Sequence, residues 1–214
     1  GLLKIILENN IKLKIKDLIN YSCQLYNEQS LKFDVKNIQF ELSNFFKERL
    51  KYFMREKKIR QDIIEASTTI YNTDDIVKTY KKAEILNNEI KKDVGVDVIS
   101  NYKRAYKIIS AEGKNKNIEV TGSVDVGIFN NEHEKNLYKK IHEIKKDFAS
   151  ISIENDYKAL LRVLASSKNE VDNFFDNVIV NDQDNVIKKN RLELLKMFCL
   201  TFDSYFNFSK IESV

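Results

Sequence analysis

The chain has 214 residues, of which 36 are Lys or Arg and 32 are Asp or Glu, so its formal net charge is +4. This length is enough for one domain or two small ones with a buried core, and 43% hydrophobic residues exclude a disordered chain. No segment approaches the roughly 18 consecutive apolar residues of a membrane span, and no signal-peptide cleavage site follows the apolar start. The two distant cysteines indicate a reducing, cytoplasmic compartment.

The basic charge needs care as an indicator of function, because only six of the 36 cations are arginine and the chain contains no proline and five glycines. This bias is typical of an A/T-rich genome, so lysine richness alone does not indicate nucleic-acid binding, and the positions of the cations must decide. The chain also begins at Gly1, without Met, inside a helical apolar pattern. We therefore expect it to be a piece of a longer polypeptide.

Helical periodicity dominates the sequence and predicts an all-α fold. The expected helices cover residues 2–9, 15–28, 38–57, 60–70, 73–90, 96–111, 131–147, 155–166, 171–175 and 183–208. Thr73 is the expected N-cap of its helix, since two acidic residues follow it. Residues 113–129 hold three of the five glycines and predict the longest irregular connection, in which only 118–126 shows a strand-like alternation.

The residue types that usually carry catalysis form no recognisable motif. His133 and His142 are nine residues apart on one expected helix, so they face opposite sides and cannot share a metal ion. His133 does not begin a zinc-protease motif, because Leu137 stands where the second histidine is required. The chain has no glycine-rich phosphate loop and no nucleophile elbow. We predict no catalytic residue and no metal site, and interpret both histidines as surface residues.

Three segments near the C-terminus are more specific. Residues 156–165, the Phe-Phe-Asp-x-Val-x-Val run at 174–180 and the Asn-Arg-Leu-Glu-Leu-Leu run at 190–195 closely resemble the C-terminal end of the bacterial glycyl-tRNA synthetase beta subunit. In that family these runs belong to a DALR-type anticodon-binding domain. Earlier segments resemble preceding parts of the same subunit in the same order: 1–8, 46–56, 62–66 and 102–109. The chain departs from the family in its more polar ending at 208–212.

The resemblance implies a helical region at 1–94, continuing from a preceding domain, and a DALR-type anticodon-binding helical domain at 95–214. It implies that this portion binds tRNA(Gly), including the anticodon arm, and supports glycine attachment without holding the active site. The implied partners are tRNA(Gly) and the alpha subunit, in a heterotetramer of two alpha and two beta subunits and without a membrane. The resemblance assigns ATP and Mg to the alpha subunit, so no cofactor is expected here.

A second reading of the same helices stays open. They could form a purely structural module that docks the beta subunit to its partner subunit. Binding of tRNA(Gly) against a non-cognate tRNA across a salt series separates this reading from RNA binding, because phosphate contacts make affinity depend on salt.

Helix geometry divides the 96–111 helix into two faces. The apolar stripe is expected to contain Val98, Tyr102, Ala105, Tyr106 and Ile109. The basic face, directed away from that stripe, carries the RNA-binding candidates Lys103, Arg104 and Lys107, and Lys114 and Lys116 extend it into the loop. Arg104 is the first choice for base recognition, since a planar guanidinium can stack on an unpaired base. A solvated helix face is the alternative.

The same construction on the 38–57 helix places Leu42, Phe46, Leu50 and Phe53 inward. The opposite ridge carries secondary candidates for the RNA backbone: Lys47, Lys51, Arg55 and Lys58. Here, too, solvation is the alternative to a role in binding.

The last helix carries the family-signature residues Asn190 and Arg191. Arg191 lies in the middle of an apolar stripe, where a cation must be paired or strongly hydrogen-bonded, and Asp176 and Asp182 are near in sequence. We predict that Arg191 is buried, pairs with a carboxylate and clamps the preceding loop, so Asp176, Asn190 and Arg191 form a structural signature. The exposed cations of this helix, expected among the RNA-binding residues, are Lys189 and Lys196.

Overall fold

The computed structural model describes residues 1–29, 32–69, 75–114, 119–151 and 156–212. Of these residues 76% are helical and none lies in a strand, so the predicted all-α class is confirmed. The chain divides into two compact units, Gly1–Asn87 and Asn88–Val214. The domain boundary predicted between residues 94 and 95 therefore lies inside the second unit. None of the described helices is long and apolar enough to cross a bilayer.

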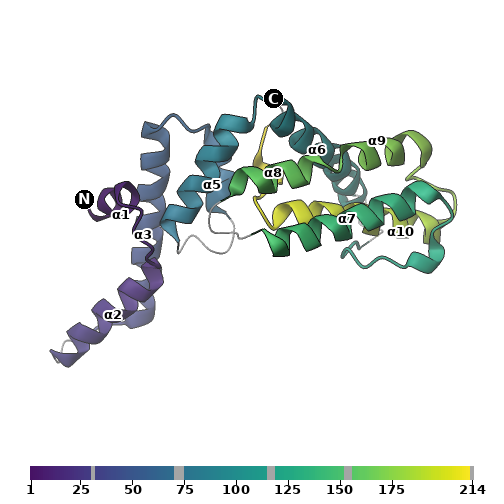
Figure 1. Cartoon of the computed structure of the whole chain (residues 1–214). Helices are drawn as coiled ribbons and strands as arrows, with labels where there is room; N and C mark the ends of the chain where they lie inside the picture. The colour runs from purple at the N-terminus through teal and green to yellow at the C-terminus, as the bar shows by residue number, and fades with distance from the viewer. Residues whose placement is uncertain (30–31, 70–74, 115–118, 152–155, 213–214) are drawn as a thin grey trace. The chain divides into compact units, whose positions relative to one another are not determined.

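The first unit is built from amphipathic helices that follow the predicted order (Figure 1). They are α1 (Leu2–Glu8), α2 (Ile15–Glu28), α3 (Val35–Glu56), α4 (Gln61–Thr68) and α5 (Ile76–Glu89), whose last two residues belong to the second unit. Helix α3 packs against α1, α2 and α4. Its side chains Leu50 and Met54 are fully buried, as are Ile63 and Ile64 of α4.

In the first unit, one prediction is wrong and another lies outside the described residues. Leu42, expected inward, is 38% exposed, because the described helices cover only part of the apolar face of α3. At the N-terminus of α5, the Asp75 side chain accepts a hydrogen bond of 2.9 Å from the Lys78 N–H through Oδ1. The predicted cap, Thr73, lies outside the described residues.

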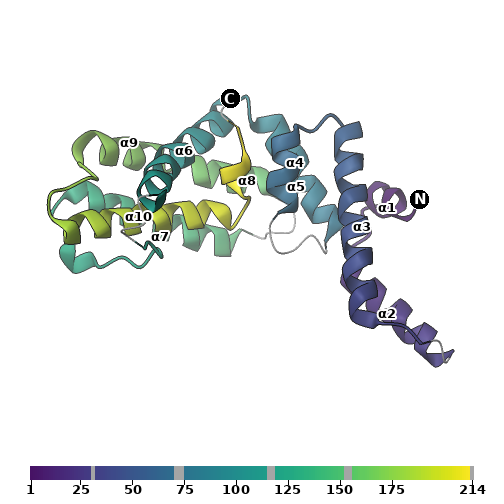
Figure 2. The ribbon, with the colours of Figure 1, turned by 180° about the vertical axis from the view of Figure 1, so that it is seen from behind.

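The second unit surrounds an aromatic core. Its elements are α6 (Asp93–Lys114), η1 (Val126–Ile128), α7 (Glu132–Ser150), α8 (Tyr157–Ala165), α9 (Lys168–Asn177), α10 (Asn185–Asp203) and η2 (Phe208–Lys210). Helix α10 packs against α6 and α7, and both α6 and α7 contact α8 and α9 (Figures 1 and 2). The largest fully buried side chains here are aromatic: Tyr102, Phe174, Phe198, Phe202, Phe206 and Phe208.

The ends of α6 and α10 were predicted wrongly. Helix α6 runs to Lys114, so Gly113 is helical and the following connection begins later than expected. No strand forms in the described part of that connection, residues 119–131. Helix α10 ends at Asp203, because the Asp203 carboxylate accepts hydrogen bonds from the Phe208 N–H and the Tyr102 hydroxyl, both at 3.2 Å. The chain turns there and returns Phe208 to the core.

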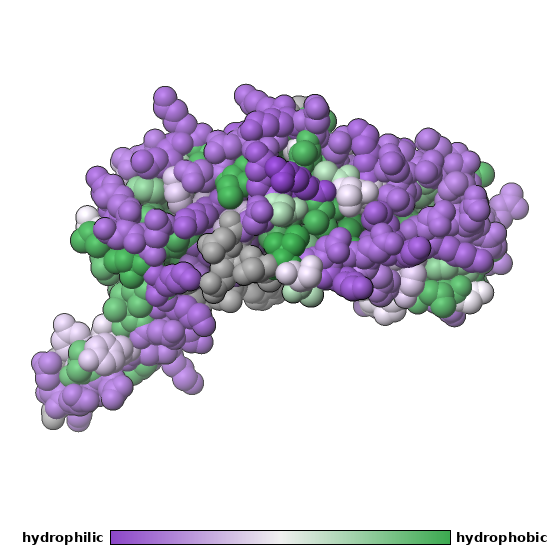
Figure 3. Space-filling model, in the orientation of Figure 1, coloured by the Kyte–Doolittle hydropathy of each residue, from purple (hydrophilic) through white to green (hydrophobic). Residues whose placement is uncertain are grey.

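The surface of the second unit separates polar from apolar side chains. Over α9 and the adjoining part of α7 the face seen in Figure 3 is predominantly hydrophilic. The apolar residues of these helices, such as Leu137, Ile141 and Phe174, point into the core and are almost completely buried. The outer side of α7 and α9 is therefore available for polar contacts.

Candidate RNA interface

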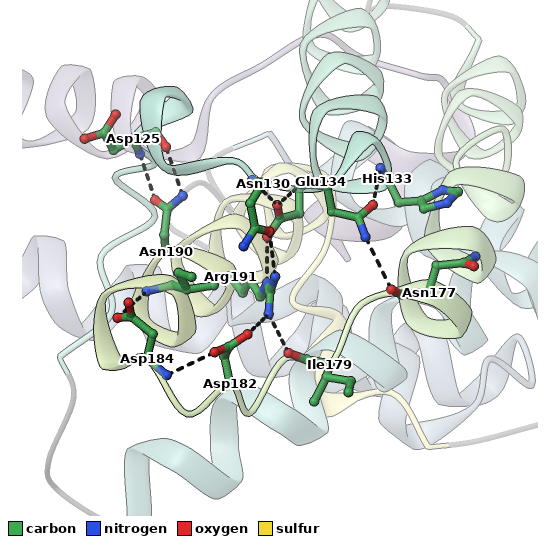
Figure 4. Close-up of polar contacts among 12 residues, drawn as sticks. Asp125, Asn130, His133, Glu134, Asn177, Ile179, Asp182, Asp184, Asn190 and Arg191 are labelled. Atoms are coloured by element: carbon green, nitrogen blue, oxygen red, sulfur yellow. Dashed lines mark hydrogen bonds and ion pairs between the residues drawn. The ribbon is translucent and has the colours of Figure 1, made fainter.

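The guanidinium of Arg191 is the centre of a buried polar cluster (Figure 4). Arg191 is 6% exposed. Its Nε donates to Glu134 Oε1 and its Nη1 to Asp182 Oδ2, each at 2.6 Å. The remaining hydrogen bonds go to Ile179 O at 2.8 Å and Asn130 Oδ1 at 2.9 Å. The predicted burial and carboxylate pairing are thus confirmed, with Asp182 as one of the two partners.

Asp176 is not a partner of Arg191 in the structure. It lies on the exposed side of α9, and its carboxylate is 3.9 Å from the guanidinium of Arg104 instead. The second partner of Arg191 is Glu134 of α7, which no local sequence pattern indicated, because it is 57 residues away. The pair joins α10 to the first turn of α7.

Glu134 and Asp182 each hold a chain turn as well as the guanidinium. Glu134 forms the capping box of α7 with Asn131, and its Oε2 accepts from the N–H groups of Asn130 and Asn131 at 3.0 Å. The pKa of Asp182 is held below its usual range by the Asp184 N–H and then by Arg191. A carboxylate with a lowered pKa stabilises the fold at neutral pH, and this contribution disappears as the pH falls through that pKa.

Two further side chains of α10 fix the connection that precedes α7. The Asn190 amide exchanges two hydrogen bonds of 2.9 Å with the backbone N–H and C=O of Asp125. Glu193, which is buried, accepts from the backbone N–H groups of Thr121, Gly122 and Ser123 through Oε2. Gly122 has a φ of +91°, a conformation that favours glycine. Sequence reasoning assigned no role to Glu193.

The predicted basic face of α6 is partly covered by a neighbouring helix. Arg104 donates to Asp172 Oδ1 at 2.6 Å, and its guanidinium lies 4.6 Å from the ring centroid of Phe175. Its side chain is 41% exposed. The Arg104 side chain thus lies outside the core, but α9 supplies it with an acidic and an aromatic partner that the sequence did not indicate.

The other cations of this face differ in accessibility. Lys103 is half-buried and donates to Ser209 O at 3.4 Å, whereas Lys107 is exposed. Lys114 is the last residue of α6, and Lys116 lies outside the described residues. Tyr106, expected in the apolar stripe, is 36% exposed, although its ring stacks on that of Tyr102.

Replacing Arg104 with Ala should lower the free energy of unfolding by about 1 kcal/mol. The change removes a partly exposed ion pair and a cation–π contact, and solvent screening limits both contributions. Lys107→Ala on the same helix is the control and should change stability by less than about 0.5 kcal/mol. Chemical denaturation of both variants provides the measurement. Equal stabilities would show that the α9 contacts of Arg104 contribute nothing.

The remaining predicted cations are distributed over both units. Lys189 of α10 is exposed, but Lys196, expected to be exposed, is half-buried. On α3, Lys47 is half-buried and Lys51 pairs with Glu48 and Glu65 at 3.2 and 3.4 Å. Arg55 and Lys58 are exposed, and Arg55 Nε donates to Gln61. The availability of these residues to RNA stays a prediction.

Helix α7 carries a row of three lysines and one histidine that sequence reasoning missed. Lys135, Lys139, His142 and Lys146 are all exposed, and their spacing of four, three and four residues places them within an arc of about 60° on a helix. No carboxylate pairs with these three lysines in the described part of the chain. We call these four residues the α7 ridge. The i, i+4, i+7 spacing was visible in the sequence, but only the fold shows which side of α7 is outward.

Groups suited to covalent or metal chemistry are few among the described residues. Both cysteines are buried, and burial raises the pKa of the Cys199 thiol, which disfavours the reactive thiolate. No group of three His, Cys, Asp or Glu side chains with metal-binding geometry occurs in the described ranges. His142 is exposed and packs on the Tyr138 ring, with centroids 4.5 Å apart.

The second unit is thus an all-α domain that exposes several lysines and holds the connection before α7 through Asn190 and Arg191. Residues 98–214 match the family model described as DALR anticodon binding domain, and the chain belongs to this family. Residues 1–69 match the model described as glycyl-tRNA synthetase beta subunit. The resemblance seen in the sequence is therefore confirmed.

Individual relatives agree with the family models. The chain is 35% identical over 212 residues to the glycine–tRNA ligase beta subunits of Rickettsia africae and Rickettsia conorii, and 34% identical to that of Rickettsia typhi. Each comparison covers 99% of this chain and 29% of the relative. The chain thus spans less than a third of the length of these relatives.

Proposed function

We propose that this chain is the tRNA(Gly)-binding, non-catalytic C-terminal portion of a glycyl-tRNA synthetase beta subunit. The observation that carries the proposal is the match of residues 98–214 to an anticodon-binding domain. The names of the relatives, which refer to glycine–tRNA ligase, support tRNA(Gly) as the tRNA that is bound. Exposed lysines on α7, and Lys107 on α6, supply the cations that a phosphate backbone requires.

The proposed role determines the partners. The active site, with its ATP and Mg, belongs to the alpha subunit, and two alpha and two beta subunits assemble in the cytoplasm. Within this assembly the chain holds the anticodon arm while the alpha subunit attaches glycine to the tRNA. The enzyme is accordingly a glycine–tRNA ligase, to which this portion contributes recognition.

A docking module is the second candidate, and one observation favours it. The first unit exposes several large apolar side chains. Tyr21 of α2 and Phe40, Phe45 and Tyr52 of α3 are each at least 50% exposed. Exposed apolar groups of this kind are common at protein interfaces. The two functions can reside in different units of the same chain.

Binding of tRNA(Gly) by the intact chain tests the proposed function. We expect tRNA(Gly) to bind more tightly than a non-cognate tRNA, with an affinity that falls as salt rises, because phosphate contacts release counterions. Fluorescence anisotropy over a salt series measures both quantities. Replacing Lys103, Arg104 and Lys107 with Ala should reduce the salt dependence if the α6 face contributes. A folded chain that binds neither tRNA would favour the docking module.

A further inference from the structure

A small pocket opens between α7 and α9 beside the α7 ridge. Its volume is about 190 Å³, smaller than the sites of drug-sized ligands. It is lined only by polar side chains: Asn136, Lys139, Lys140, Glu143, Glu170 and Asn173. Lys139 belongs both to the pocket and to the ridge, so a polyanion that follows the ridge passes the opening.

The charges inside the pocket balance one another. Lys140 Nζ lies 3.3 Å from Glu143 Oε2 and 4.0 Å from Glu170 Oε1. With Lys139, the lining has two positive and two negative side chains. A phosphate gains little from a site without net positive charge. The two amides, Asn136 and Asn173, can each donate and accept hydrogen bonds. A neutral ligand with several polar atoms therefore fits the lining better than an anion does.

Glu170 gives the pocket its chemical preference. Its Oε2 is buried and lacks a hydrogen-bond partner. Among the buried side-chain oxygens and nitrogens of the described residues, it is the one without a partner. An ionised carboxylate only accepts hydrogen bonds, and a buried acceptor without a donor is unfavourable. Rotation about the terminal side-chain bond is soft, so Oε2 can turn toward a donor placed in the pocket. The missing partner is a hydrogen-bond donor, and an N–H group of a ligand can supply it.

We infer that this pocket receives one unpaired RNA base that carries an exocyclic amino group, with Glu170 accepting the amino hydrogen bond. The inference rests on the proposed function. Cytosine, adenine and guanine have such a group. Uracil has a carbonyl at the position of the cytosine amino group, and its N3–H donor lies between two carbonyls that would face the carboxylate with like partial charge. Single-stranded bases are recognised through their polar edges, and carboxylates accept from the cytosine amino group. The adjacent phosphates lie on the α7 ridge through Lys139.

Two RNA hairpins that differ only in their loops test this assignment. One loop is all cytidine and the other all uridine, so the comparison exchanges amino groups for carbonyls. The intact chain should bind the cytidine loop about 5- to 150-fold more tightly, the range that corresponds to one good base contact. In Glu170→Gln the ratio should fall toward one, because an amide can present either a donor or an acceptor.

Glu132→Gln is the matched control, since it removes one negative charge from the exposed first turn of α7, outside the pocket. This variant should keep the wild-type ratio, while any general electrostatic effect would appear equally in both variants. Salt-dependent binding of both hairpins with a ratio that Glu170→Gln does not change would overturn the base pocket and leave the proposed function standing. If the wild-type chain binds neither hairpin nor tRNA(Gly), the proposed function fails, and the base pocket fails with it.

Discussion

Arg191→Ala should lower the free energy of unfolding by about 3–5 kcal/mol, the cost of breaking a buried ion pair by removing one partner. The change leaves the buried Glu134 carboxylate without its cation and removes hydrogen bonds to Asp182, Ile179 and Asn130. Urea denaturation followed by circular dichroism measures the loss. We expect it to exceed that of any substitution of an exposed cation in the chain.

Two further variants make this expectation specific. Arg162→Ala removes an exposed arginine from α8 and should change stability by less than about 0.5 kcal/mol. Combining Arg191→Met with Glu134→Gln should cost less than the sum of the single changes, because the second change removes the unpaired buried charge. Additive costs, or a loss below 1 kcal/mol for Arg191→Ala, would refute the clamp as a stabilising element.

Simultaneous replacement of Lys135, Lys139 and Lys146 with Ala should weaken tRNA binding strongly at low salt and less at high salt. Each phosphate contact contributes about 0.7–0.9 to the slope of log K against log salt, so three lost contacts make the slope less steep by roughly 2–3. The fold should survive, because all three side chains are exposed. Titrations at four or more salt concentrations give the slope.

A variant with three alanines in the first unit, at Lys16, Lys32 and Lys36, serves as the control for net charge. These side chains are also exposed, and the formal charge changes by the same amount. We expect its slope to stay close to that of the wild type. If both triple variants change the slope equally, RNA responds to the overall charge of the chain and the α7 ridge is merely solvated.

The predictions from sequence succeeded where a residue's surroundings follow from helical periodicity. The position of Arg191 among the apolar residues of its own helix implied burial, and burial implied a carboxylate partner. They failed where a second helix decides the surroundings. Helix geometry placed Arg104 on the face of α6 opposite the apolar stripe, but it could not show that Asp172 and Phe175 of α9 contact the guanidinium there.

The sequence by itself determined the all-α class, most helix positions and the family, because side-chain periodicity and contiguous motifs are local properties of a chain. Tertiary structure decided which polar groups meet, such as Glu134 with Arg191 and Glu193 with the backbone of residues 121–123. It also decided that side chains of α7 and α9 form a pocket around Glu170. It also decided that Lys139 is available while Lys140 is paired. Such pairings depend on how helices distant in sequence pack, and a helical period specifies only which side of a helix is apolar.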